Sequence, residues 1–270
     1  MSNNLLKGKR GIIFGALNDM SIAWKVAEEC VSNGAKIVLT NAPTALRLGS
    51  IKKLAKKCNC EVISADATSI EDLENLLSQS MDILDGKIDF ILHSIGMSIN
   101  VRKKRDYTDL NYDYLIKGFD ISALSFHKLL QTAMKLDAIN DWGSVLALSY
   151  VAAQKTFPSY NDMAENKSYL ESIARSFGYH YGKDKKVRIN TISQSPTMTT
   201  AGGGVKGFDT FFNYAEKMSP LGNADSLSCA KFCVALFSDY TKMITMQNIY
   251  HDGGFSSMGI SDEVINLLEK

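Results

Sequence analysis

Seven short apolar runs recur along the chain, and stretches of helical character separate them. Nearly every position in each run is apolar and many are β-branched, which suits strands that are buried on both faces of a parallel sheet. The runs are RGIIFGA (10–16), AKIVLT (35–40), EVISAD (61–66), KIDFILHSIG (87–96), GSVLALSY (143–150), KVRINTIS (186–193) and MQNIYHDGG (246–254).

The segments between the runs predict long helices, above all 111–137, 159–182 and 223–238. Repeated strand–helix units joined by right-handed crossovers build a doubly wound sheet. We therefore expect an α/β fold with a single Rossmann-like, doubly wound parallel sheet of about seven strands flanked by helices.

The composition argues against several other classes of protein. The 270 residues are 45% hydrophobic, and the formal net charge of +1 gives no reason to expect nucleic acid or an anionic membrane as partner. No apolar run reaches the roughly 18 residues that span a bilayer, and the start has no signal-peptide layout. The five cysteines form no C-x-x-C pair and the four histidines are scattered, so we expect a cytoplasmic protein without a metal site.

Doubly wound sheets bind ligands beyond the carboxyl ends of their strands. Gly15 allows a tight exit from the first run, and Ser21 and Ile22 follow at a predicted helix N-terminus, where free amides attract phosphate. Asp66 and Ala67 end the third run, where a carboxylate can accept a hydrogen bond from an adenine amino group. Small residues end the fourth run, where a cofactor backbone would pass, at Ser94, Ile95 and Gly96. We therefore expect residues 1–270 to form a single dinucleotide-binding and catalytic domain.

The residues after the second run bear on the choice of dinucleotide. No acidic residue stands there to bind a ribose 2′-hydroxyl. No basic residue directly follows the run to bind a 2′-phosphate, although Arg47 lies seven residues on. We expect NADH rather than NADPH.

The stretch SYVAAQKTFPSYNDMAENKSYLE (149–171) holds the candidate catalytic groups. Ser159 and Asp162 predict a capping box, with a helix that starts near Tyr160. Tyr160 and Lys167 would be separated by about 700° of helical rotation and about 10.5 Å along the axis, so both would lie on one face. Tyr169 would point to the opposite face.

Tyr150 ends the fifth run and should reach the same edge of the sheet. Two phenols and one ammonium could then meet at one ligand, and a nearby ammonium lowers the pKa of a phenol or strengthens its hydrogen bond. Such a phenol can stabilise an oxyanion as it forms. The spacing alone is equally consistent with Tyr150 and Tyr160 as half-buried packing residues.

Two loops after strands should overhang the ligand site. Residues 97–109, MSINVRKKRDYTD, are polar and basic, and residues 195–212 contain three consecutive glycines between apolar patches. Loops this long in a compact domain are commonly functional. We expect a mobile substrate-binding flap over about 195–217.

Taken together, these features resemble the bacterial enoyl-[acyl-carrier-protein] reductases, NADH-dependent members of the short-chain dehydrogenase/reductase family. The resemblance covers nearly the whole chain: SIA (21–23), DA (66–67), HSIG (93–96), LSY followed by YN and Lys167, INTIS…P…T (189–199) and HDGGFSSMG (251–259). Its most specific element is Tyr-x6-Lys, formed by Tyr160 and Lys167. Ordinary short-chain dehydrogenases have Tyr-x3-Lys, and here Ala164 stands at that position. Glu165 departs from the usual pattern between the pair, and at about 200° from Lys167 it should face outward.

The resemblance implies NADH-dependent reduction of the trans-2 double bond of enoyl-acyl-carrier-protein thioesters in type II fatty acid synthesis. It implies that Tyr160 stabilises the enolate oxygen, that Lys167 holds the nicotinamide ribose, and that Tyr150 lines the pocket. The expected cofactor contacts are Gly15, Ser21, Ile22, Asp66, Ala67, Ser94, Ile95, Gly96, Lys167, Ile192, Pro196, Thr197 and Thr199. The expected substrate contacts are Met97, Tyr150, Tyr160, Met163, Ala201 and Val205.

The resemblance also implies partners. Its substrate is carried on acyl carrier protein, which is acidic, and RKKR (102–105) with Lys206 and Lys217 could dock it, although a solvated charge run is the commoner reading of such a segment. The family is typically a homotetramer.

Two alternatives to the enoyl reductase remain open. A 3-ketoacyl or other carbonyl reductase on the same fold would need a serine where Tyr150 stands and a lysine where Ala164 stands. A non-catalytic dinucleotide-binding sensor would not need the phenol–ammonium pair of Tyr160 and Lys167.

Overall fold

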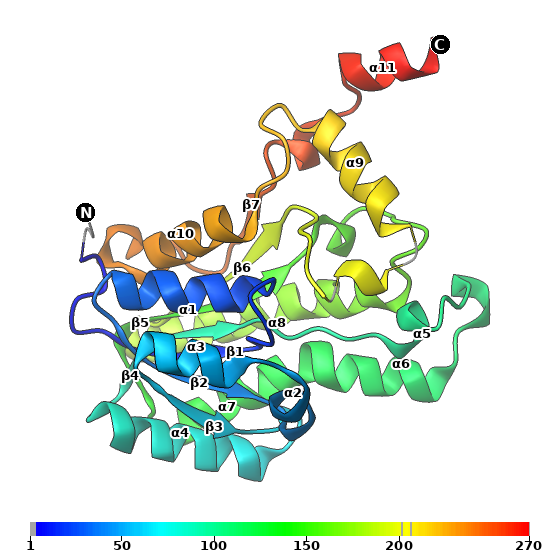
Figure 1. Ribbon diagram of the computed structural model, residues 1–270. Coiled ribbons are helices and arrows are strands. Elements are labelled where there is room, and N and C mark those ends of the chain that lie inside the picture. Colours follow the sequence, from blue (N-terminus) through cyan, green and yellow to red (C-terminus); the bar gives the residue numbers. More distant parts are fainter. Residues whose placement is uncertain (1–3, 201, 206, 270) are drawn as a thin grey trace.

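The computed structural model describes residues 4–200, 202–205 and 207–269. In this part of the chain, seven parallel strands form one sheet (Figure 1). The strand order is β3-β2-β1-β4-β5-β6-β7, so the chain begins mid-sheet and builds outward in both directions. The strands are β1 (Arg10–Phe14), β2 (Lys36–Asn41), β3 (Glu61–Ser64), β4 (Ile88–His93), β5 (Ile139–Ser149), β6 (Arg188–Gln194) and β7 (Asn248–His251). The predicted doubly wound parallel sheet is confirmed.

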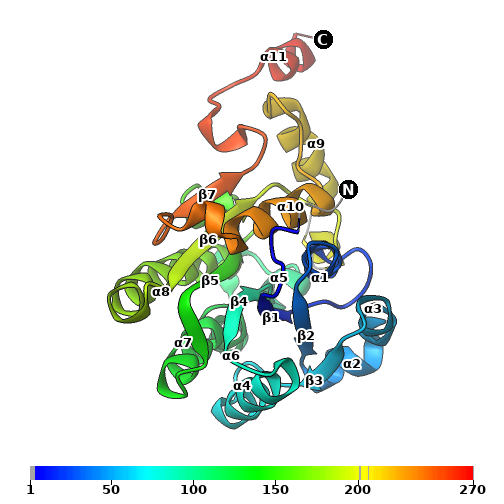
Figure 2. The ribbon, with the colours of Figure 1, turned by 90° about the vertical axis from the view of Figure 1, so that its left-hand side faces the viewer.

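Helices cover both faces of this sheet (Figure 2). One face carries α1 (Ile22–Ser32), α3 (Ile51–Cys58) and α10 (Ser226–Phe237). The other face carries α4 (Ile70–Leu84), α7 (Ser125–Lys135) and α8 (Asp162–Lys185). The other helices are α2 (Pro43–Leu48), α5 (Ile99–Arg102), α6 (Tyr112–Phe119), α9 (Phe208–Met218) and α11 (Asp262–Leu268). Short helical turns are η1 (Tyr107–Asp109), η2 (Asp120–Leu124), η3 (Val151–Ala153), η4 (Gly202–Gly204), η5 (Asp239–Thr241) and η6 (Phe255–Ser257).

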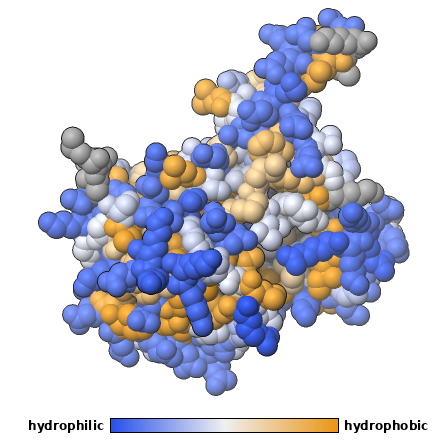
Figure 3. Space-filling view, viewed as in Figure 1, coloured by the Kyte–Doolittle hydropathy of each residue, from blue (hydrophilic) through white to orange (hydrophobic). Residues whose placement is uncertain are grey.

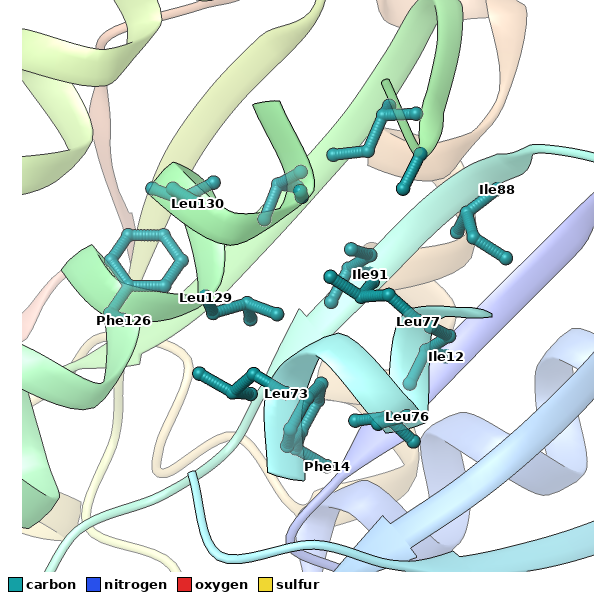
Figure 4. Close-up of a cluster of buried hydrophobic side chains, with 14 of the residues drawn as sticks. Ile12, Phe14, Leu73, Leu76, Leu77, Ile88, Ile91, Phe126, Leu129 and Leu130 are labelled. Carbon is teal, nitrogen blue, oxygen red and sulfur yellow. The ribbon is translucent and has the colours of Figure 1, made fainter. Parts of the chain in front are cut away.

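The core explains why the strand sequences are almost continuously apolar. Side chains alternate between the two faces of a strand, so Ile12 and Phe14 of β1 enter one hydrophobic cluster and Ile13 enters the other. The first cluster packs strand residues against Leu76 of α4 and Leu129 of α7 (Figure 4). Both faces are covered by helices, so both sets of side chains must be apolar.

The segment predicted as one helix over 111–137 is interrupted. It consists of α6, a π-helical turn over Asp120–Leu124, and α7. In this turn the Ser122 hydroxyl accepts a hydrogen bond from the Met97 N–H and donates one to the Met97 carbonyl, both at 2.9 Å. Such π-helical turns are frequent at functional sites, and this one holds the loop that leaves β4.

The predicted start of α8 is wrong. Asn161 is the N-cap residue, Ser159 makes no cap, and Tyr160 lies in the preceding turn. The Asp162 carboxylate is buried and accepts hydrogen bonds from the Ser98 hydroxyl (2.6 Å) and the Asn100 amide (3.0 Å). The Asp162 side chain, which the capping-box pattern assigned to the end of α8, therefore makes tertiary hydrogen bonds instead.

The segment after β6 stands apart from the sheet. It contains η4 and α9, and α9 with α11 projects away from the body of the molecule (Figure 1). α9 buries only Ala215 and Met218. The predicted flap over about 195–217 therefore coincides with a weakly buried segment.

All five cysteines are unpaired thiols. No described helix is both long and apolar enough to cross a membrane. Within the described residues, no three acidic, histidine or cysteine side chains gather as they would around a metal ion.

Candidate active site

The exit from β1 requires glycine. Gly15 has φ +92°, and a Cβ placed on it would lie 1.9 Å from the Ser94 carbonyl oxygen at the end of β4. Only a residue without a side chain allows the two strand ends to approach this closely. The strand order reverses between β1 and β4, which is where such sheets bind their ligands.

Ser21 organises the loop between β1 and α1. Its hydroxyl oxygen accepts hydrogen bonds from the N–H groups of Leu17 and Asn18, both at 3.2 Å. α1 begins at Ile22 with no acidic residue in its first turn. The positive end of the helix is therefore free of a competing carboxylate and can face a phosphate.

Asp66 is exposed just beyond β3. One carboxylate oxygen accepts hydrogen bonds from the backbone N–H (2.9 Å) and the hydroxyl (2.7 Å) of Thr68. Ala67 beside it is buried. No described residue donates a hydrogen bond to the second oxygen, which can accept from an adenine amino group.

Lys167 is almost completely buried, and its ammonium donates a 2.7 Å hydrogen bond to the Leu148 carbonyl at the end of β5. A Cβ built on Gly96 would lie 3.5 Å from this ammonium and 3.6 Å from the end of Met163. The structure thus brings Lys167, Gly96 and Met163 together. An ammonium has three donors, and among the described residues only the one bond is made, so two donors remain for a ligand.

Burial lowers the pKa of Lys167 from its ordinary 10.5 to about 8, and Glu171 opposes this shift. The Glu171 carboxylate is also buried, and it accepts hydrogen bonds from the Ser149 hydroxyl (2.7 Å) and the Gln154 amide (3.1 Å). The sequence analysis did not identify Glu171. Its position four residues after Lys167, one helical turn on, was the available signal.

Tyr150 and Tyr160 lie against each other, with ring centroids 5.0 Å apart and planes at 51°. Burial raises the pKa of both phenols above the ordinary 10, with further contributions from Asp252 for Tyr150 and from Tyr150 for Tyr160. The expected lowering by an ammonium is therefore wrong. Both phenols remain protonated at neutral pH, and neither hydroxyl has a hydrogen-bond partner among the described residues.

The turn after β6 is held by polar residues, of which Thr197 and Thr199 were predicted as cofactor contacts and Gln194 and His251 were not. Gln194 donates to the Ala224 carbonyl (2.9 Å) and to the Thr197 hydroxyl (3.2 Å), and its amide oxygen contacts His251 at 2.7 Å. The Thr199 hydroxyl accepts a hydrogen bond from the Gly202 N–H at 3.0 Å. The signal for Gln194 was a long polar side chain at the end of an apolar strand.

Ile192 lies near the end of β6. Its side chain is fully buried in the core between the sheet and α10, and its backbone is paired with Leu148 of β5 and Ile249 of β7. Its contact with the nicotinamide stays a prediction, in which the backbone of Ile192 and not its side chain would meet the cofactor. Of the other residues predicted here, Pro196 is buried and Thr197 and Thr199 are partly exposed.

The expected substrate side is lined with aromatic rings. Phe157 lies 5.4 Å from Tyr150 and 5.6 Å from Phe211 of α9, measured between centroids. Neither phenylalanine was predicted. Val205 is partly exposed between η4 and α9, and Ala201 lies outside the described residues. Tyr169, expected to point away, is exposed and packs on Phe119 at 4.9 Å.

The basic loop over 97–109 contains α5, and hydrophilic residues gather on this side of the molecule (Figure 3). Arg102, Lys103 and Lys104 are exposed, whereas the Arg105 guanidinium is bonded to the carboxylate and carbonyl of Asp109 at 2.9 Å. Glu165 is exposed and accepts a hydrogen bond from the Tyr107 hydroxyl at 2.7 Å, so the prediction that it faces outward is confirmed.

A sheet of this topology, with a buried lysine and a neutral phenol at the edge beyond β5, defines a dinucleotide-dependent reductase of the short-chain dehydrogenase type. Comparison with known proteins gives the family. The family model described as enoyl-(acyl carrier protein) reductase matches residues 15–256, and the chain belongs to this family.

Its relatives match over almost their full length. The chain is 33% identical to the enoyl-[acyl-carrier-protein] reductase [NADH] FabI of Rickettsia bellii, covering 96% of this chain and 98% of that one. It is 65% identical to the protein in the crystal structure of the FabI–NADH complex from Alistipes finegoldii, with a TM-score of 0.95 over 96% of this chain and 92% of that one. The enoyl-[acyl-carrier-protein] reductase (NADH) of Aquifex aeolicus is 30% identical, with a TM-score of 0.86 over 95% and 99%.

Proposed function

We propose that the chain carries out the NADH-dependent reduction of the trans-2 double bond of enoyl-acyl-carrier-protein thioesters in type II fatty acid synthesis. The observation that carries the proposal is the pair of Tyr160 and Lys167 at one edge of the sheet. Tyr160 offers a neutral hydroxyl without an internal partner, and Lys167 offers a buried ammonium with free donors beside Gly96. The membership of the enoyl reductase family supports the same reaction.

The residues present fit NADH. Gly15 lets the ends of β1 and β4 approach closely beside the cofactor, and the amides at Ser21 and Ile22 can face the pyrophosphate. Asp66 and Ala67 would hold the adenine, Ser94 to Gly96 would lie along the cofactor backbone, and Pro196, Thr197 and Thr199 would meet the nicotinamide amide. When bound, NADH would supply the hydride that adds to the β-carbon of the enoyl thioester, and a proton added at the α-carbon would complete the reduction.

Tyr160 stabilises the charge that builds on the thioester oxygen as the enolate forms. Its raised pKa keeps the proton on the phenol, so the hydroxyl donates a hydrogen bond instead of repelling the oxyanion. The Lys167 ammonium binds the ribose hydroxyls and adds positive potential to the same region. Tyr150 closes one side of the pocket together with Met97, Met163 and the flap residue Val205.

One assay separates this reaction from its two alternatives. The purified protein is mixed with NADH and crotonyl-CoA, or a longer enoyl thioester, and the absorbance of NADH is followed. Loss of NADH with the enoyl substrate supports the proposal, and loss only with a 3-ketoacyl thioester would establish the carbonyl reductase. No loss with either substrate would establish the sensor. Ala164, partly exposed at the Tyr-x3-Lys position, disfavours the carbonyl reductase.

We place the docking of acyl carrier protein on the exposed cations Arg102, Lys103 and Lys104, because an acidic carrier is attracted to a basic surface. Lys217 lies 3.5 Å from Glu263 and is partly neutralised, and Lys206 lies outside the described residues. Lys104→Glu should raise KM for substrates on the carrier but not on coenzyme A. Lys53→Glu on the exposed side of α3 is the matched control, and equal KM values on the carrier for Lys104→Glu and wild type would reject this surface.

Three further features complete the proposal. The protein acts as a homotetramer, for which exposed Tyr112 and Ile116 on α6 offer an apolar face. Sedimentation should show about four times the 29.8 kDa of one chain. Its unpaired cysteines suit the reducing cytoplasm. Residues 1–270 act as a single domain, with the flap over about 195–217 closing on the acyl chain.

A further inference from the structure

Asn161, directly after Tyr160, has an unusual backbone conformation. Its φ is 46° and its ψ is −138°. Asn59 and Asp85 also have positive φ, but with ψ of 54° and 55° they lie in the ordinary left-handed region at helix ends. The Asn161 conformation is one that glycine adopts readily and other residues rarely do, so contacts elsewhere must hold it.

The contact that holds Asn161 comes from the basic loop. Its side-chain amide donates a 2.6 Å hydrogen bond to the Arg105 carbonyl, and the residue is almost completely buried. The next residue, Asp162, is bound to Ser98 and Asn100 in the same loop. Two consecutive residues after Tyr160 are therefore fixed to the segment that leaves β4.

Tyr160 itself has little else to set its position. It lies in a turn outside α8, with its N–H bonded to the Phe157 carbonyl at 2.9 Å. Its ring contacts Tyr150, and its hydroxyl has no partner among the described residues. A change in the Asn161 backbone would rotate the adjoining peptide and move the phenol.

We propose that Asn161 is a positioning residue for Tyr160, which through its hydrogen bond to the Arg105 carbonyl holds the phenol where the enolate oxygen forms. The inference rests on the proposed function of Tyr160. Oxyanion stabilisation depends steeply on geometry, and a displacement of about 1 Å can reduce a rate by about 10²-fold. Asn161 touches neither the substrate nor NADH in this proposal.

Two variants test the hydrogen bond from the Asn161 side chain to the Arg105 carbonyl, which is the anchor of this turn. Asn161→Asp keeps the size of the side chain but removes the donor at neutral pH, and Asn161→Gly accepts the backbone conformation but removes the anchor. Both should lower kcat by about tenfold or more, with KM and the NADH dissociation constant close to wild type. Asn59→Gly, which changes an exposed positive-φ asparagine at the end of α3, should leave all three quantities unchanged.

The pH profile gives a readout that a merely structural role would not produce. A protonated aspartic acid can donate to the Arg105 carbonyl. Burial at this position and the neighbouring Asp162 carboxylate should raise its pKa above the ordinary value of about 3.9, so kcat of Asn161→Asp relative to wild type should recover as the pH is lowered from about 7 to about 5. The ratio to wild type cancels the titration of the charged groups nearby. These are Lys104, Arg105 and Asp106, which line a small cavity beside Asn161, and Asp162.

The outcomes separate this inference from the proposed function. If wild type does not oxidise NADH with an enoyl thioester, the proposed function fails. If wild type is active and both folded Asn161 variants keep kcat within about twofold, the positioning role is wrong. A fall in kcat together with equal losses of NADH affinity and melting temperature would also overturn it. If Asn161→Asp does not fold, Asn161→Gly decides the question.

Discussion

The two sides of the site are built differently. On the cofactor side, hydrogen bonds between side chains and the backbone fix the loops: the Ser21 hydroxyl accepts from the N–H groups of Leu17 and Asn18, and the Asp66 carboxylate accepts from the Thr68 N–H. On the substrate side, aromatic rings join the flap to the body, as Phe211 does to Phe157. The bound group on the first side is always the same molecule, whereas acyl chains vary in length. Directional polar contacts suit the first task and adaptable apolar contacts the second.

The largest effect is expected from a change at Tyr160, whose phenol lies between the cofactor side and the substrate side. Tyr160→Phe removes the donor that meets the enolate oxygen but keeps the ring against Tyr150. Loss of one such donor typically lowers kcat by about 10²–10³-fold. Steady-state kinetics with crotonyl-CoA should show this loss, while a fluorescence titration should give NADH affinity within about twofold of wild type. Equal, small changes in both quantities would contradict the assigned role.

Lys167→Ala tests whether the lysine belongs to the cofactor side. Its ammonium is proposed to bind the nicotinamide ribose, so both NADH affinity and turnover should fall, each by about 10- to 100-fold for the loss of a charge-assisted hydrogen bond. The same fluorescence titration and assay measure the two effects. Lys87→Ala is a suitable control because Lys87, just before β4, is paired with Asp137 at the end of the sheet opposite the proposed site. A lower kcat with unchanged NADH affinity would mean that Lys167 acts on the reacting substrate and does not bind NADH.

The affinity for NADH should depend on pH through the same residue. Burial lowers the pKa of Lys167 to about 8, and the ammonium is the form that binds, so the dissociation constant should rise by about tenfold per pH unit above that value. Tyr150 and Tyr160 do not interfere, because burial raises their pKa values above 10. Burial holds the pKa of His93 at about 3, so this histidine stays neutral.

Titrations of NADH fluorescence between about pH 6.5 and about pH 9.5 measure this dependence. Lys167→Ala should show a flat profile over the same range. If the NADH dissociation constant of wild type did not change with pH over this range, NADH binding would not require the Lys167 ammonium. Glu171→Gln should shift the wild-type profile to lower pH, because Glu171 raises the pKa of Lys167.

The difference between the two sides also explains what the sequence could predict. The five inner strands β2, β1, β4, β5 and β6 were found because most of their residues on both faces are buried, which leaves a nearly continuous apolar run, whereas the edge strands β3 and β7 are more exposed. Gly15 and Gly96 were found because the end of each apolar run marks the end of a strand, and ligands bind beyond the strand ends. The start of α8 was missed because Asp162 bonds to Ser98 and Asn100, contacts that are distant in sequence. The lowering of the Tyr160 pKa, one of the two effects expected of a nearby ammonium, is not found, because burial is the largest cause acting on this phenol and raises its pKa, and burial depends on tertiary packing.

The smallest expected effect lies on the flap, where Phe211 of α9 packs on Phe157 next to Tyr150. Phe211→Ala should raise KM for a long-chain enoyl thioester by about three- to tenfold, and less for crotonyl-CoA, because each buried methylene contributes about 0.8 kcal/mol. NADH affinity should not change, because the aromatic contact of Phe211 is with Phe157 on the substrate side. Tyr240→Ala removes an exposed ring before β7, on the edge of the sheet away from the site, and should alter neither quantity. If Phe211→Ala instead weakened NADH binding as much as substrate binding, α9 would belong to the cofactor side together with Pro196, Thr197 and Thr199 at the start of the flap, and the division of the site into a polar and an aromatic half would be wrong.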